Sequence, residues 1–176
     1  MSNVRRLSRS SGAYENHPDL MNTRTATEAD LDQVSALADE IAALHSGNEP
    51  AVFAAPNAGR DREFWRSCIT QTDATVTVAT EAGVIVGFIS AKIASATAPT
   101  FLKERTICRV GTIVVSATVQ RRGIGTSLIR SIEAWARSRS AVETRLEVFA
   151  FNRQALSFYA SLGYATQSHT MHRGLV

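Results

Sequence analysis

A short glycine-containing turn between a strand-like run and an amphipathic helix constrains this fold more than any other feature of the sequence. The turn, Thr118–Thr126, follows the apolar run Thr112–Val115 and leads into a helix that begins near Gly123. Because a further strand-like run follows, the passage favours a right-handed crossover between parallel strands of one sheet. The turn also leaves backbone N–H groups unpaired at the positive end of a helix dipole, an arrangement that can hold a pyrophosphate.

The residues of the turn narrow the ligand further. Gly123 and Gly125 remove side chains where the backbone must approach phosphate closely, and Arg121 and Arg122 supply cationic donors for phosphate oxygens. The turn lacks the Gly-Lys-Ser/Thr ending of nucleoside triphosphatase loops and the Gly-x-Gly-x-x-Gly spacing of dinucleotide sites. Taken alone, the turn is also compatible with a plain strand-to-helix connection that carries two solvated arginines.

Length and composition indicate one soluble domain. The 176 residues suffice for a single core, and the apolar share of 44% and charged share of 20% are those of a globular protein. No apolar run approaches the roughly 20 residues that span a bilayer, so we expect no membrane association. The arginines near the N-terminus precede no apolar stretch of a secretory signal, which makes a cytoplasmic location the expectation.

Charge and cysteine usage restrict the expected partners. The net charge of +3 is mild, and the sequence has no basic stripe with interleaved aromatic residues that would indicate nucleic acid binding. A bound anionic cofactor would account for part of the positive balance. Cys68 and Cys108 lie far apart without metal-ligand spacing, so we expect two free thiols in or near the core and no metal site.

Hydrophobic periodicity predicts a mixed α/β (α+β) domain over residues 22–176, preceded by a disordered extension over residues 1–21. The expected sheet is mixed and mostly antiparallel, has six to seven strands and is covered by helices on both faces. Helices are expected over about residues 27–45, 61–70, 123–137 and 152–162, and strands over about residues 22–25, 75–80, 84–93, 107–115, 143–149, 164–166 and 169–173.

Two segments, read together, resemble the signature of the GNAT N-acetyltransferase superfamily. Gln120–Gly125 (QRRGIG), after a strand, is similar to the family's Gln/Arg-x-x-Gly-x-Gly/Ala loop. Asn152–Tyr164 (NRQALSFYASLGY), after the next strand, is similar to its Asn-x-x-Ala-x-x-Phe-Tyr-x-x-x-Gly-Phe/Tyr segment. The resemblance is specific from Ile107 onward and only topological before that, and it implies the acyl-CoA N-acyltransferase fold with acetyl-CoA as donor.

The resemblance also implies which residues hold the cofactor. The parallel strands would part and leave backbone groups before the turn free for the pantetheine amides, while the N–H groups of the turn hold the pyrophosphate. Asn152 resembles the family's asparagine near the pantetheine arm, and it is an equally good helix cap. The residues implied in cofactor binding are Ile113, Val114, Val115, Gln120, Arg121, Arg122, Gly123, Ile124, Gly125, Thr126, Asn152, Ala155 and Tyr159.

Tyr159 is the residue that the resemblance implies in catalysis. Its phenol, with an ordinary pKa of about 10, can protonate a departing thiolate whose conjugate acid has a pKa of about 8.5. From spacing alone, Phe158 and Tyr159 would instead be read as aromatic packing of a helix on a sheet. The motif favours the catalytic interpretation.

The general base is not fixed by the sequence. Many family members place a carboxylate on the strand before the loop, but here the corresponding stretch is Arg109–Ile113, which has none. The candidates are Glu147, Glu81 and His45, acting directly or through water. His169 and His172 are expected at the surface or at the lip of the substrate site.

Together these expectations describe an acetyl-CoA-dependent N-acetyltransferase that acts on a primary amine of a small molecule, peptide or protein, by direct attack in a ternary complex. The first helices and the loop of residues 46–60, with Phe53, Phe64 and Trp65, would wall the acceptor site. The alternatives are a non-catalytic acyl-CoA-binding or regulatory domain and a transferase for a different acyl group. Exposed strand edges of such a sheet would also allow a homodimer.

Overall fold

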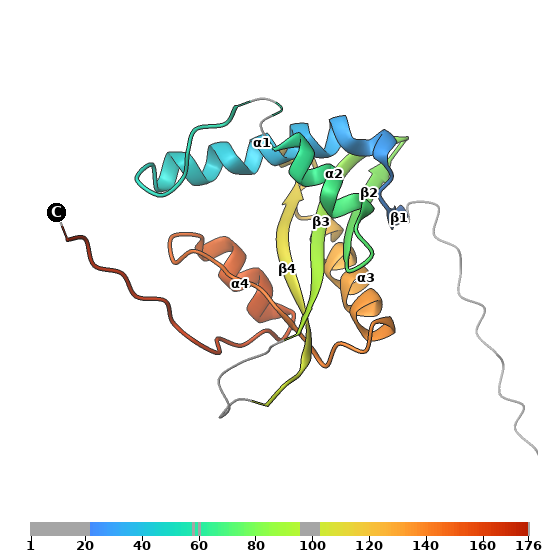
Figure 1. Ribbon diagram of the computed structural model, residues 1–176. Helices are drawn as coiled ribbons and strands as arrows, with labels where there is room; N and C mark the ends of the chain where they lie inside the picture. Colours follow the sequence, from blue (N-terminus) through green and yellow to red (C-terminus); the bar gives the residue numbers. More distant parts are fainter. Residues whose placement is uncertain (1–21, 58, 60, 96–102, 176) are drawn as a thin grey trace, which may run out of the picture.

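A five-stranded sheet with the strand order β1-β2-β3-β4-β5 forms the centre of the computed structural model (Figure 1). The structure describes residues 22–57, 59, 61–95 and 103–175, so the extension predicted over residues 1–21 lies outside the described residues. β1 to β4 pair antiparallel with one another, and β5 pairs with β4 in parallel. The strands are β1 (Asn22–Thr25), β2 (Ala74–Glu81), β3 (Val84–Ser95), β4 (Thr106–Val115) and β5 (Glu143–Arg145).

The helices cover both faces of the sheet, as the sequence predicts. α1 (Leu31–Asn48) and α2 (Arg62–Thr70) pack on one face, around a cluster that includes Leu31, Val34, Trp65, Val78 and Phe88. α3 (Ile124–Ser138) and α4 (Arg153–Ser161) contribute to the cluster on the other face, which includes Ile89, Cys108, Leu128, Ile132 and Tyr159. Among the described residues, no helix combines the length and apolar character of a bilayer-crossing segment.

The approach from β1 to α1 is fixed by a buried carboxylate. Asp30 closes a short 3-10 turn (Glu28–Asp30) and accepts hydrogen bonds from the Thr27 backbone N–H at 2.7 Å and from Arg24 at 2.7 and 2.8 Å. The bonds from Arg24, and then those from Thr27, hold the pKa of Asp30 well below its usual range, although burial opposes them. This junction sets the direction in which α1 crosses the sheet.

A β-bulge bends β4 in its middle. Ile89 pairs with Ile113 and Ala91 with Val110, so Gly111 and Thr112 of β4 together oppose the single residue between them on β3. That residue is Ser90, whose hydroxyl oxygen accepts the Thr112 backbone N–H at 2.9 Å. At the bulge, the Thr112 backbone N–H thus bonds to a side chain and not to the backbone of β3.

The number of strands differs from the sequence prediction of six to seven. In the described part of the chain, residues 165–175 contain no strand, and β5 ends at Arg145 where a strand to Phe149 was expected. The two large apolar side chains of the last segment, Met171 and Leu175, are 91% and 90% exposed. A segment that buries so little apolar surface does not offset the entropy lost on ordering it as strands.

β4 and β5 stay paired over only three residues. The parallel register runs from Ile107–Glu143 to Arg109–Arg145, whereas β4 continues to Val115. Beyond Arg109, β4 keeps its hydrogen-bonded neighbour β3 but has left the ladder with β5. The predicted parting of the parallel pair is therefore present, and it begins next to the bulge.

Both thiols are free, as expected. Cys68 is half-buried on α2 and Cys108 is buried on β4, and burial raises the pKa of the Cys108 thiol to about 11. A thiol with this pKa is protonated at neutral pH and is a poor nucleophile. The described residues contain no group of three or more His, Cys, Asp or Glu side chains arranged to hold a metal ion.

Candidate active site

The turn after β4 ends in a helix start that has no side-chain cap. Gly123 occupies the N-cap of α3 with a φ of 82°, in the left-handed region that favours glycine, and Arg121 has a φ of 63°. The first helical bond in the described structure joins the Ser127 N–H to the Gly123 carbonyl at 3.0 Å. Because no side chain accepts from the N–H groups of the first turn, an anion can do so.

The predicted phosphate ligands of the turn differ in what they already contact. Arg122 forms an ion pair with Glu81 at the β2–β3 turn, with hydrogen bonds of 3.2 and 2.5 Å. Arg121 is exposed and has no ion-pair partner among the described residues. Gln120 donates from Nε2 to the Val115 carbonyl at 3.2 Å and so ties the turn to the end of β4.

Other predicted cofactor residues present their backbone rather than their side chains. Ile124 is 2% exposed in the core below α3, and Val114 is 6% exposed in the cluster below α1. A ligand in this region would therefore meet the main chain of β4 and of the α3 N-terminus. Gly125 lies against Phe158 of α4, since a Cβ at Gly125 would come 3.1 Å from the Phe158 ring.

α4 begins with the cap that the sequence predicts. The Asn152 side-chain oxygen accepts the Ala155 backbone N–H at 3.0 Å, while among the described residues its amide group makes no further hydrogen bond. The helix carries Tyr159, which is 7% exposed and packs against Phe158 and Tyr164 with ring centroids 5.2 and 5.7 Å apart. Asn152 thus orients the helix that holds the predicted acid.

Burial raises the pKa of Tyr159 to about 12, and Tyr164 contributes a smaller increase. In the described structure, no hydrogen bond occupies the Tyr159 hydroxyl group. Tyr164 differs, because its hydroxyl pairs with the Thr144 hydroxyl at 2.9 Å and donates to Glu133 at 3.3 Å. Tyr159 is therefore a protonated, unengaged O–H donor at neutral pH.

The three candidate bases lie in different surroundings. Glu81 is ion-paired with Arg122, and Glu147 is exposed in the segment after β5. His45, near the C-terminal end of α1, stacks on Phe53 at 4.8 Å and contacts two further rings, those of Phe149 and Phe151, at 5.9 and 5.8 Å. Burial lowers the pKa of His45, so its imidazole is neutral and able to accept a proton at pH 7.

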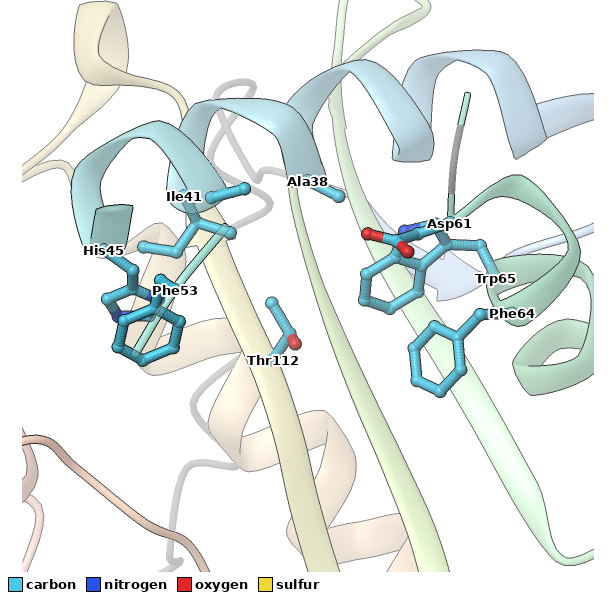
Figure 2. Close-up of a pocket in the computed structure, with 9 residues that line it drawn as sticks. Ala38, Ile41, His45, Phe53, Asp61, Phe64, Trp65 and Thr112 are labelled. Carbon is cyan, nitrogen blue, oxygen red and sulfur yellow. The ribbon is translucent and has the colours of Figure 1, made fainter. Parts of the chain in front are cut away.

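His45 also lines a pocket of about 370 Å³ between α1, α2 and β4 (Figure 2). Phe53, Phe64 and Trp65, the three aromatic residues expected around an acceptor site, line this pocket together. The other lining residues are Ala38, Ile41, Ala42, Asp61 and Thr112. His169 and His172 are exposed in the last described segment and are not among the lining residues.

Sequence reasoning missed Asp61, Thr112 and the α1 residues of the pocket. Ala38, Ile41 and Ala42 share one helix face with His45 at spacings of three and four, a pattern that the sequence gives equally to core packing. Asp61 is the first residue of the helix predicted over about residues 61–70, and it occupies the N-cap of α2, although its side chain makes no capping bond. Thr112 lies at the bulge in β4, whereas the sequence analysis predicts an uninterrupted strand over about residues 107–115.

Comparison with known proteins adds independent findings. Residues 38–164 match the model of the Acetyltransferase (GNAT) family. No curated protein sequence matches the chain significantly. Among solved structures, a mutant of the BH1408 protein from Bacillus halodurans has a similar fold, with a TM-score of 0.84 and 22% identity over 89% of this chain and 100% of that chain.

Two further structures share the fold. The aminoglycoside N-acetyltransferase AAC(6')-Iy, in complex with CoA, has a TM-score of 0.71 and 16% identity over 89% of this chain and 95% of its own. A possible acetyltransferase from Clostridium difficile 630 has a TM-score of 0.71 and 18% identity over 90% of this chain and 99% of its own. At these identities the likeness concerns the fold, while the family assignment follows from the family model.

Proposed function

The chain belongs to the acetyltransferase (GNAT) family, and on this premise we propose that it transfers an acetyl group from acetyl-CoA to a primary amine by direct attack in a ternary complex. The observation that carries the proposal is that β4 leaves its parallel partner after Arg109 and leads into the uncapped N-terminus of α3. One stretch of chain thereby offers free backbone edges for an extended amide chain and free N–H groups for a pyrophosphate.

The cofactor would be held mainly by main-chain groups. The backbone of Ile113–Val115 would pair with the pantetheine amides in the manner of an added strand, and the N–H groups of Ile124, Gly125 and Thr126 would bind the pyrophosphate. Arg121 has no ion-pair partner in the described residues, whereas Arg122 would have to leave Glu81 to bind phosphate. Bound acetyl-CoA supplies the activated acyl group.

The pocket between α1, α2 and β4 would receive the acceptor amine. It contains Thr112, which the bulge displaces on the strand that would bind the thioester arm. An amine held there by the surrounding rings would be positioned for attack, and positioning of this kind supplies a large share of the rate in transfer reactions. No covalent enzyme intermediate is required.

His45 is the general base that the geometry supports best. Among the candidates named from the sequence, it alone lines the pocket, whereas Glu81 is committed to Arg122 and Glu147 is exposed beyond β5. An ammonium must lose a proton before its nitrogen can attack, and a neutral imidazole beside the pocket can accept that proton.

Tyr159 would act at the leaving group. Its raised pKa keeps the phenol protonated at every physiological pH, so an O–H is always available to the thiolate that develops as the carbonyl–sulfur bond breaks. With a pKa gap of about 3.5 units to an ordinary thiol, donation of a hydrogen bond in the transition state is favoured over complete prior transfer of the proton.

Two measurements on the purified full-length chain test the proposal. Calorimetry should detect binding of CoA and acetyl-CoA, and thiol release should become dependent on an added primary amine, with acetylated product detected by mass spectrometry. Binding without turnover on any amine would instead favour a non-catalytic acyl-CoA-binding domain. Absence of CoA binding would overturn the cofactor assignment.

A further inference from the structure

The pocket that would receive the acceptor is walled almost entirely by apolar and aromatic groups. His45 and Phe53 stand at one end and Phe64 and Trp65 at the other, with α1 side chains between them (Figure 2). Trp65 is 5% exposed and is braced edge-on against Phe88 at 5.1 Å and Phe64 at 4.9 Å. An aromatic wall of this kind favours a ligand with a flat or bulky apolar body.

One of the described side chains around the pocket is a carboxylate. Asp61 lines it from the start of α2, and its carboxylate has no ion-pair partner among the described residues. Two described arginines near Asp61 in the sequence have other partners, because Arg62 pairs with Asp32, and Arg66 with Glu63 at 2.5 Å. Within the described part of the chain, the Asp61 carboxylate is therefore available to a ligand.

The second titratable group of the lining does not add a positive charge. His45 lies among Phe53, Phe149 and Phe151 and is neutral at pH 7 because burial lowers its pKa. Among the described lining residues, Asp61 is thus the one charged side chain. A ligand with one positive charge matches this carboxylate, whereas a further ammonium group would meet no second carboxylate among the described lining residues.

We infer that the acceptor of this enzyme is a hydrophobic, ring-bearing amine with a single positive charge, and that Asp61 recognises this charge. The inference rests on the proposed acetyltransferase function and narrows its substrate class. An amine nitrogen over Thr112, between the two titratable groups in Figure 2, is attracted by Asp61 and can pass its proton to His45. The aromatic walls add cation–π attraction to the same charge.

The test compares acceptors that differ in charge and body. With saturating acetyl-CoA, the full-length chain is assayed on 2-phenylethylamine, on n-butylamine, and on the polycations spermidine and kanamycin. We expect kcat/KM for 2-phenylethylamine to exceed that for each of the others at least tenfold. Equal or greater efficiency on a polycation would overturn the substrate class and leave acetyl transfer itself standing.

Asp61→Asn tests the recognition of charge. Asparagine is as good an N-cap residue as aspartate, so α2 should remain folded. We expect KM for 2-phenylethylamine to rise about fivefold, the effect of one exposed charge contact, with kcat and acetyl-CoA affinity unchanged. In the unmodified chain, added salt should screen Asp61 and raise KM, and in Asp61→Asn this salt dependence should disappear. A purely structural role of Asp61 would leave the salt dependence of KM unchanged.

A matched control is Asp73→Asn, which neutralises an exposed carboxylate that pairs with Lys92 at 3.3 Å, away from the pocket. It should leave KM and its salt dependence as in the unmodified chain. An unchanged KM in Asp61→Asn would overturn the role of Asp61. Bound acetyl-CoA without turnover on any amine would overturn the proposed function and this inference together, a result distinct from turnover on the wrong class.

Discussion

Replacing Tyr159 by phenylalanine isolates the hydroxyl group from the packing of its ring. The ring is 7% exposed and contacts Phe158 and Tyr164, and phenylalanine preserves these contacts. Since no hydrogen bond in the described structure engages the hydroxyl, its loss should change the free energy of unfolding by less than about 0.5 kcal/mol. Any loss of activity can then be assigned to chemistry.

The size of the kinetic effect follows from the role of a general acid. Such groups contribute about 10²- to 10⁴-fold, and the pKa of about 12 at Tyr159, well above that of a thiol, places the expected effect at the lower end. We expect Tyr159→Phe to reduce kcat about 100-fold, which corresponds to about 2.7 kcal/mol of transition-state stabilisation. The dissociation constant of acetyl-CoA should stay within about twofold, because a ground-state contact is not removed.

The assay is amine-dependent thiol release at saturating substrates between pH 6 and 10, with acetyl-CoA binding measured by calorimetry. Because the acid form of Tyr159 persists to its pKa of about 12, kcat of the unmodified chain should show no alkaline decline attributable to this residue up to pH 10. Tyr164→Phe is the matched control: its hydroxyl bonds Thr144 and Glu133, so it should lose stability and keep kcat. A full kcat in Tyr159→Phe, or an equal loss in both variants, would refute the reasoning.

Three further changes test the base and the scaffold. His45→Gln should lower kcat/KM about 100-fold. In the unmodified chain kcat/KM should rise with pH, with a midpoint below the ordinary histidine pKa of about 6.5 because burial lowers the His45 pKa, and the variant should lose this rise. An unaltered pH profile would exclude His45 as the base. Asp30→Asn should lower the free energy of unfolding, measured with urea at pH 7, by about 2 kcal/mol. Because the folded pKa of Asp30 is lowered, this stability is present above about pH 4 and is lost as the pH falls toward that folded pKa, so equal differences at pH 7 and pH 2 would contradict the assignment. Gly87→Ala should lower the free energy of unfolding by about 1–3 kcal/mol, because its Cβ would lie 2.8 Å from the Val114 carbonyl oxygen. Gly47→Ala is the control and should not destabilise the fold, because a Cβ there would have no atom within 4 Å. Calorimetric melting of both variants measures the difference.

Local signals made the secondary structure around the predicted cofactor site predictable. The glycine at the N-cap of α3, the asparagine cap of α4 and the helical spacing around Tyr159 each depend on a few neighbouring residues, so the sequence alone places them on the correct elements. The same holds for the hairpin of β2 and β3. The layers of the fold followed from these elements, because amphipathic helices and a half-apolar sheet have few ways to pack.

Long-range contacts explain what the sequence could not supply. The pairing of Glu81 with Arg122 joins residues 41 positions apart, and it removes a candidate base that looked free in a turn. The contact of His45 with Phe149 likewise joins the end of α1 to the segment after β5. The strands predicted after Gly163 are not formed in the described residues, because a long-range contact is missing there. Alternation of residues predicts a strand only where a neighbouring surface exists to bury one of its faces.

The pocket proposed for the acceptor depends on both local and long-range information. The sequence was enough to predict that Phe53, Phe64 and Trp65 line it. It was not enough to single out Asp61, which in the sequence is one of several carboxylates at helix starts. Only the folded chain shows that Arg62 and Arg66 are taken by other partners and that Asp61 is left facing the pocket. Specificity in a pocket of this kind therefore depends on which charges remain unpaired after folding, a property of the tertiary structure rather than of any motif.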